Sequence, residues 1–115
     1  MLSYNAWVDV FYADRQVAKI CASEKKMVQK YGKVRANKLA ARLQQLRVAE
    51  SLADLRLVTG RCHELSADRA GQLALDLDGA VRLVFEPDGG EVDEHGQLLW
   101  ESVESVVILE IVDYH

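Results

Sequence analysis

Five side chains in the second half of the sequence are of the types that move protons or stabilise negative charge. His63, Asp113 and His115 are potential general acids or bases. Arg69 and Arg82 can stabilise the charge that develops on a reacting oxyanion or phosphate. If the fold brings them together, these residues can catalyse proton transfer at a charged substrate.

Each of these residues also has a purely structural interpretation. His63 is consistent with a half-exposed position in a strand, and Arg69 with a simple ion pair to Asp68 or Glu64. The residues 113–115 are equally consistent with a solvated tail. The residue types alone therefore leave a site and a set of ordinary surface contacts as open alternatives.

The C-terminal stretch favours the first alternative. Residues 106–112 form an apolar, β-branched run that is interrupted only by Glu110, which predicts a strand buried on at least one face. Asp113, Tyr114 and His115 follow this strand without a linker. We expect a core strand to hold these three side chains on a rigid support, as candidates for a site.

No pattern in the sequence indicates a cofactor or a metal. The chain has no nucleotide-binding loop, no spacing of metal ligands and no nucleophile elbow. Cys62 and His63 are adjacent, and neighbours on a strand point to opposite faces, so they are a poor metal pair. We expect both cysteines, Cys21 and Cys62, to be reduced.

Composition predicts one soluble domain over residues 1–115. Half of the residues are apolar and 28% are charged, as in ordinary globular proteins. No apolar run approaches the roughly 18 residues of a membrane span, and the N-terminus lacks a signal-peptide pattern. These features predict a cytoplasmic protein without a membrane partner.

Charge is distributed unevenly along the chain. The net charge is −4, yet residues 15–47 contain ten Lys or Arg and a single acid, Glu24. Apolar residues recur there at helical spacing, which predicts a basic helical hairpin over about residues 14–49, with one helix ending at Gly32 and the next beginning at Lys33. The basic face is either a solvated surface or a phosphate-binding surface.

Strand-like patterns surround this hairpin. Ala6 to Tyr12 predicts an early strand, and the region of about residues 61–115 predicts a sheet. Leu73, Leu75 and Leu77 alternate toward the helices, so Arg82 and, by the same alternation, Tyr114 should project from the opposite face. Residues 86–104 contain seven acids and no Lys or Arg, which predicts a long acidic loop with Trp100 as its anchor.

The predicted fold class follows from this order of elements. It is α+β: an N-terminal strand, an antiparallel helical hairpin, then antiparallel strands that form a small sheet with the helices on one face. A short helical turn after Ser51 should connect the two parts.

Three segments in this order carry a resemblance to a known family. Residues 62–71 read Cys-His-Glu-Leu-Ser-Ala-Asp-Arg-Ala-Gly, residues 81–85 read Val-Arg-Leu-Val-Phe, and residues 110–115 read Glu-Ile-Val-Asp-Tyr-His. Together they resemble toxins of the RelE/ParE superfamily, and within it the host-inhibition-of-growth (HigB) branch of bacterial type II toxin-antitoxin systems. The resemblance covers essentially the whole chain.

The resemblance implies an endoribonuclease that cuts mRNA on the ribosome without a metal and so inhibits translation. In such a reaction the RNA 2′-hydroxyl attacks its own phosphate. Carried onto this chain, His63, Asp113 and His115 would share the base, acid and orienting roles. Arg69 and Arg82 would hold the phosphate, while Tyr114 would stack on or orient a base.

The implied partners are the ribosome, mRNA and a cognate helix-turn-helix antitoxin protein, with DNA contacted only through the antitoxin. The basic hairpin would then face ribosomal RNA. Ser66 and Ala70 stand where relatives usually have Lys or Arg, and this chain is acidic overall. Both departures reduce the expected number of phosphate contacts.

Two alternatives stay open beside the nuclease. One is a ParE-like toxin that inhibits DNA gyrase by binding alone, although binding would not require His63, Arg82 and the terminal Asp-Tyr-His set. The other is a catalytically weak module that binds an antitoxin and assists repression of an operator.

Overall fold

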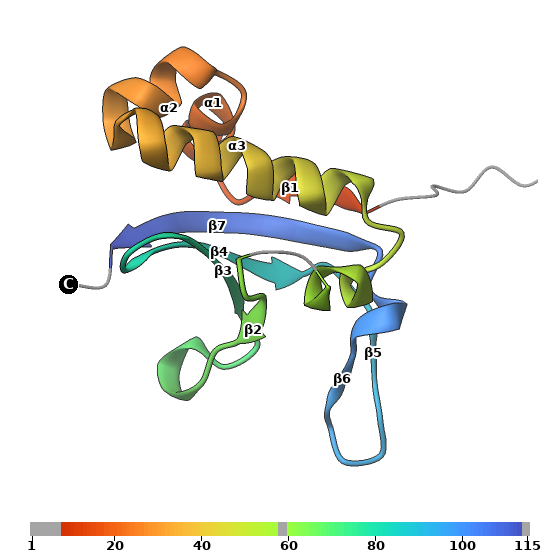
Figure 1. Ribbon diagram of the computed structural model, residues 1–115. Coiled ribbons are helices and arrows are strands. Elements are labelled where there is room, and N and C mark those ends of the chain that lie inside the picture. The colour runs from red at the N-terminus through yellow and green to blue at the C-terminus, as the bar shows by residue number, and fades with distance from the viewer. Residues whose placement is uncertain (1–7, 58–59, 114–115) are drawn as a thin grey trace, which may run out of the picture.

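The computed structural model describes residues 8–57 and 60–113 of the 115-residue chain. Helices lie on one side of a five-stranded sheet, and a small two-stranded hairpin extends from the other side (Figure 1). The predicted α+β class is therefore confirmed. Among the described helices, none is long and apolar enough to cross a membrane.

The helical layer contains three helices rather than the predicted two. Helix α1 spans Arg15–Cys21, α2 spans Glu24–Tyr31 and α3 spans Lys33–Val48. The prediction of one helix before Gly32 was wrong because Ser23 begins a new helix: its Oγ accepts a hydrogen bond from the backbone N–H of Lys26. Gly32 ends α2 as predicted, at a φ of 85° that favours glycine.

The main sheet has the strand order β1-β7-β4-β3-β2. Strand β1 (Asp9–Tyr12) runs parallel to β7 (Ser105–Asp113), and the other neighbours are antiparallel. The remaining strands are β2 (His63–Glu64), β3 (Leu73–Asp78) and β4 (Val81–Pro87). The parallel pair makes the first and last strands of the described chain neighbours, and the helices follow directly after β1.

The core lies between α3 and the sheet. Leu39, Leu43 and Leu46 of α3 are fully buried, as the helical spacing predicted. They face the alternating leucines of β3 and the residues Leu83 and Phe85 of β4. Burial of these apolar side chains provides the main stabilisation of the fold.

The face of the sheet that points away from the helices is also partly covered. Ala74 and Val84 are on this face and are nevertheless buried. The covering segment is residues 61–72, in which β2 and a short 3-10 turn, η2 (Ala67–Arg69), lie below the sheet in Figure 1. Only part of this face is therefore accessible to a ligand.

The acidic segment, residues 86–104, is structured rather than a plain loop. Strand β5 (Glu91–Val92) pairs with β6 (Leu98–Leu99), and a 3-10 turn, η3 (Trp100–Ser102), returns the chain to the sheet. At the tip, the carboxylate of Asp93 accepts hydrogen bonds from two backbone N–H groups. We call this hairpin the acidic lobe.

Trp100 attaches the acidic lobe to the rest of the protein, as predicted. It is buried, and its indole N–H donates to Glu64 at 3.0 Å. The guanidinium of Arg56 lies 4.2 Å from the ring centroid, in cation–π contact. Arg56 ends the 3-10 turn η1 (Leu52–Arg56), which is the short helical turn expected after Ser51.

A buried arginine connects the helical layer to the edge of the sheet. Arg42, which the sequence placed on the basic outer face, is instead buried and donates from Nε to the backbone carbonyl of Asp76 at 2.9 Å. Its guanidinium packs directly against Gly60, where a Cβ would lie 2.3 Å from Nε. Gly60 also has a φ of 107°. The close packing and the backbone conformation both require glycine.

The variant Gly60→Ala should therefore be strongly destabilised. Overpacking against Arg42, added to a backbone conformation that alanine disfavours, should lower the free energy of unfolding by about 2 kcal/mol or more. Urea denaturation measures the change. Gly96→Ala is the control, because its φ is 79° but no atom lies within 4 Å of the added Cβ. Equal losses of unfolding free energy in the two variants would show that overpacking against Arg42 adds nothing to the cost of the Gly60 substitution.

Candidate functional site

An ion pair across two neighbouring strands forms the centre of the candidate site. Asp76 of β3 and Arg82 of β4 lie opposite each other in the register. Nε of Arg82 is 3.2 Å from Oδ1 of Asp76. Arg82 lies between Val81 and Leu83, which face the helices, so its own side chain projects from the opposite face as the sequence predicted.

His63 approaches the same carboxylate from the edge of the sheet. It belongs to β2 and pairs with Ala74, two residues before Asp76 on β3. Its Nε2 lies 3.7 Å from Oδ1 of Asp76 and is inaccessible to solvent. This distance is longer than a hydrogen bond, so a small movement of the imidazole would be enough to form one.

Arg61 completes the group on the solvent side. Its Nε is 3.7 Å from Oδ2 of Asp76. The side chain of Arg61 is 77% exposed, whereas those of His63, Asp76 and Arg82 are 30%, 27% and 31% exposed. We call these four residues the Asp76 cluster. It is a half-buried carboxylate surrounded by an imidazole and two guanidinium groups, of which only Arg61 extends fully into solvent.

Both backbone polar groups of Asp76, its N–H and its carbonyl, form hydrogen bonds. Its N–H donates to the carbonyl of Gly60 at 2.6 Å, and its carbonyl accepts from the buried Arg42. Arg61, immediately after Gly60, has a φ of 48°, in the left-handed region that is uncommon for a residue with a side chain. Such conformations are concentrated at functional sites, where the surrounding structure maintains the strain.

Arg69 has different partners from those that the sequence suggested. It donates to Glu110 of β7 and to Gln72, both at 2.8 Å. Because β4 and β3 separate β7 from β2, the side chain of Arg69 extends across the covered face of the sheet. The alternative partner Glu64 instead accepts the hydrogen bond from Trp100. Arg69 thus holds η2 against the sheet.

Asp113 lies on the other side of the sheet from the cluster. It pairs with Val81, whose side chain belongs to the core on the helical side, and paired residues share a face. The register of β7 shifts at Leu109, between the pairs made by Val84 and Phe85. This bulge reverses the alternation in the second half of the strand. Tyr114 and His115 lie outside the described residues.

The structure adds one residue that the sequence did not single out. Asp76 is the centre of the cluster, yet it was treated only as a polar position in the alternating strand at 72–78. The available signal was an acid on the same predicted face as Arg82, on the adjacent strand of one hairpin. An acid and an arginine on the same face of adjacent strands predict a cross-strand ion pair.

Both cysteines are free thiols that burial keeps protonated. Burial raises the pKa of Cys62 to about 12, although Arg56 opposes the shift, and Glu64 adds to it. Burial likewise raises the pKa of Cys21 to about 11, against the opposing effect of Arg47. A thiolate is needed for nucleophilic or metal-binding chemistry, so neither cysteine belongs to the site.

The described residues contain no group of three or more His, Cys, Asp or Glu side chains arranged to hold a metal ion. No protein-family model, no curated protein and no solved structure matches this chain.

The raised pKa of Cys62 predicts a loss of stability at alkaline pH. Below pH 9.0, the ordinary pKa of a thiol here, Cys62 is protonated in both the folded and unfolded states. Above it the unfolded thiol ionises, while the folded thiol stays protonated until about pH 12. The folded state then binds more protons, so stability must fall as pH rises through this range.

Urea denaturation at a series of pH values from 8 to about 11 tests this expectation. Cys62→Ala should lose less stability over that range than the wild-type protein, because its unfolded state gains no thiolate at this position. If the unfolding free energies of the two proteins fall equally with pH, the raised pKa of Cys62 is contradicted.

Proposed function

We propose that this protein is a metal-independent endoribonuclease that cleaves mRNA on the ribosome as the toxin of a type II toxin-antitoxin system. The observation that carries the proposal is the Asp76 cluster, in which His63 and Arg82 contact the same carboxylate oxygen at 3.7 and 3.2 Å. The resemblance to HigB-like toxins, which rests partly on His63 and Arg82, supports the same reaction.

The cluster contains groups for one of the two proton transfers and for the charge stabilisation that RNA transesterification requires. In this reaction the 2′-oxygen loses its proton and attacks the adjacent phosphorus, the bond from phosphorus to the 5′-oxygen breaks, and that oxygen takes up a proton. The products are a 2′,3′-cyclic phosphate and a 5′-hydroxyl. His63 performs one of the two proton transfers, and the arginines stabilise the charge on the phosphorane-like transition state.

Asp76 acts through His63 and is a positioning residue. Its Oδ1 faces Nε2 of His63, so a carboxylate there favours the tautomer with a proton on Nε2 and leaves Nδ1 as the acceptor. The same oxygen holds Nε of Arg82. Asp76 therefore places the imidazole and the guanidinium around one carboxylate oxygen, and a small movement of His63 would complete its hydrogen bond.

The exposure of the four residues suggests how RNA approaches. Arg61, at the solvent side, meets the phosphate first, and Arg82 lies deeper, beside Asp76. The second proton transfer is assigned to His115, as the family resemblance implies, because Asp113 lies on the other face of the sheet. So small a set of groups depends on the ribosome to position the mRNA, which accounts for the proposed requirement for ribosomes.

Cleavage of mRNA mapped by primer extension, with and without programmed ribosomes, tests the proposal. Wild-type protein should cut only with ribosomes. His63→Gln and Arg82→Gln should each lower the rate about 100-fold or more, because one loses proton transfer and the other charge stabilisation. The matched controls are His95→Gln in the acidic lobe and Arg35→Gln, whose partner is Asp78 on the helical side.

Asp76→Asn separates positioning from catalysis. It keeps the size of the side chain but removes the charge, so cleavage should fall about 10-fold, less than in His63→Gln. Intact mRNA from folded wild-type protein would refute the nuclease. Gyrase-dependent DNA breaks in cells that produce the protein would then indicate a gyrase inhibitor. Unaffected growth of such cells would indicate an antitoxin-binding module.

A further inference from the structure

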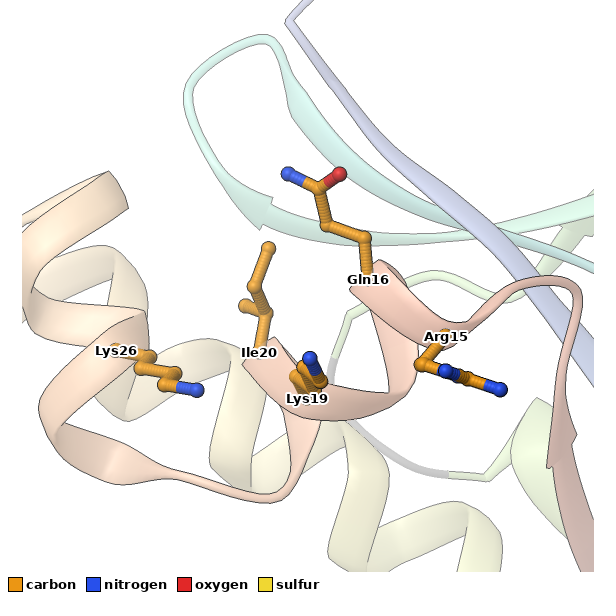
Figure 2. Close-up of a pocket in the computed structure, with 5 residues that line it drawn as sticks. All are labelled: Arg15, Gln16, Lys19, Ile20 and Lys26. Carbon is orange, nitrogen blue, oxygen red and sulfur yellow. The ribbon is translucent and has the colours of Figure 1, made fainter.

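A basic pocket lies between α1 and α2, on the opposite side of the sheet from the Asp76 cluster. It has a volume of about 440 Å³, and its lining residues are Arg15, Gln16, Lys19, Ile20 and Lys26. Figure 2 shows that four of them come from α1 and that Lys26 extends from α2 toward α1. Three of the five side chains are cations, and none is an acid.

Four other basic residues of the helical layer have partners within the protein: Arg35 with Asp78, Arg42 with the carbonyl of Asp76, Arg47 with the hydroxyl of Tyr12, and Lys30 with the ring of Tyr31. The other three, Lys25, Lys33 and Lys38, are exposed. No described carboxylate lies within ion-pair distance of Arg15, Lys19 or Lys26. These three cations differ from the exposed lysines because they line one pocket together.

Neither of the two nearest acids in the sequence forms an ion pair with these cations. Asp14 uses its carboxylate to accept the N–H of Val17 at the start of α1. Glu24 lines a different hollow, with Met27 and Arg47. Three like charges around one pocket repel one another, so an anion from outside the protein is the natural occupant.

We propose that this α1–α2 pocket binds a phosphate of an RNA backbone, as an anchoring site separate from the cleavage site. Arg15 can contact two phosphate oxygens at once, and Lys19 and Lys26 contribute two further charges. Gln16 adds an amide, and Ile20 provides an apolar wall for the adjoining ribose. This inference rests on the proposed RNA substrate.

The position of the pocket predicts a role in binding and not in chemistry. The helices cover one face of the sheet, and the Asp76 cluster is on the other face. One phosphate cannot occupy both places, so the pocket holds a nucleotide distant from the one that is cut. Loss of its cations should raise KM and leave kcat unchanged.

Binding of a 2′-O-methyl RNA oligonucleotide tests the pocket independently of cleavage, because this RNA lacks the attacking hydroxyl. Fluorescence anisotropy would measure Kd over a range of salt concentrations for wild-type protein and for the double variant Lys19→Gln/Lys26→Gln. The matched control is Lys33→Gln/Lys38→Gln, which removes the same charge from exposed positions of α3.

The pocket variant should bind about 10-fold more weakly, and the slope of log K against log salt should become shallower by about 1.4, from two lost contacts to single-stranded RNA. The control should change Kd less than about 2-fold. Equal losses in the two double variants would overturn the inference, since the whole face would then act as a diffuse charge.

Competition with inorganic pyrophosphate is the second experiment. Pyrophosphate should displace the oligonucleotide only at concentrations high enough to screen charges in general, and equally in both double variants. Tight pyrophosphate binding that depends on Lys19 and Lys26, without RNA binding, would overturn the assignment to RNA. If methylated RNA binds through the pocket but ribosome-programmed cleavage is absent, the pocket stands and the nuclease function fails.

Discussion

The contact between Arg42 and the backbone of Asp76 is the constraint on which the candidate site depends. A buried guanidinium is costly unless its hydrogen bonds are satisfied, and here Nε donates to the Asp76 carbonyl at 2.9 Å. The same guanidinium packs on Gly60, whose carbonyl accepts the N–H of Asp76 at 2.6 Å. One side chain of α3 therefore joins the helical layer, the Gly60 turn and strand β3. The carboxylate of Asp76 is fixed because its backbone is held on both sides.

From that fixed carboxylate, the pairing of strands determines which side chains can meet. The register places Arg82 opposite Asp76, and β2 brings His63 beside Ala74, two residues away on β3. In β7 the bulge at Leu109 places Ile111 on the core side, opposite Leu83, and Asp113 opposite Val81. A single extra residue in one strand thus separates Asp113 from the arginine with which the sequence grouped it. The cluster is the product of strand register rather than of closeness in the sequence.

Much of the architecture was predictable because it follows from local patterns. The leucine alternation of β3, the glycine between α2 and α3, and the apolar stripe of α3 each specify an element without reference to distant residues. Two features were not predictable, since each depends on contacts between segments: Arg42 is turned inward by Gly60 and Asp76, and Trp100 packs on Arg56 and donates to Glu64. The division of the first helix at Ser23 is different, because it depends on a local cap that the sequence contains. The role of Asp76, by contrast, depended on a register that no local pattern specifies.

A hollow beside the α1–α2 pocket is the route by which the proposed RNA strand would pass from one face of the sheet to the other. This hollow shares Gln16 and Ile20 with the α1–α2 pocket and extends to Glu110 and Ile111 of β7. Strand β1 last pairs with β7 at Ile108, so this part of β7 lies beyond the end of its parallel neighbour. Arg69 pairs with Glu110 there, and Lys30 faces the same hollow as Asp14, so both acids of the hollow lie near a cation. The acidic lobe extends from the other side of the sheet, and salt screens charges beyond about 10 Å. The proposed binding of a polyanion by a protein with a net charge of −4 would then depend on the concentration of basic residues in the helical layer, away from the acidic lobe.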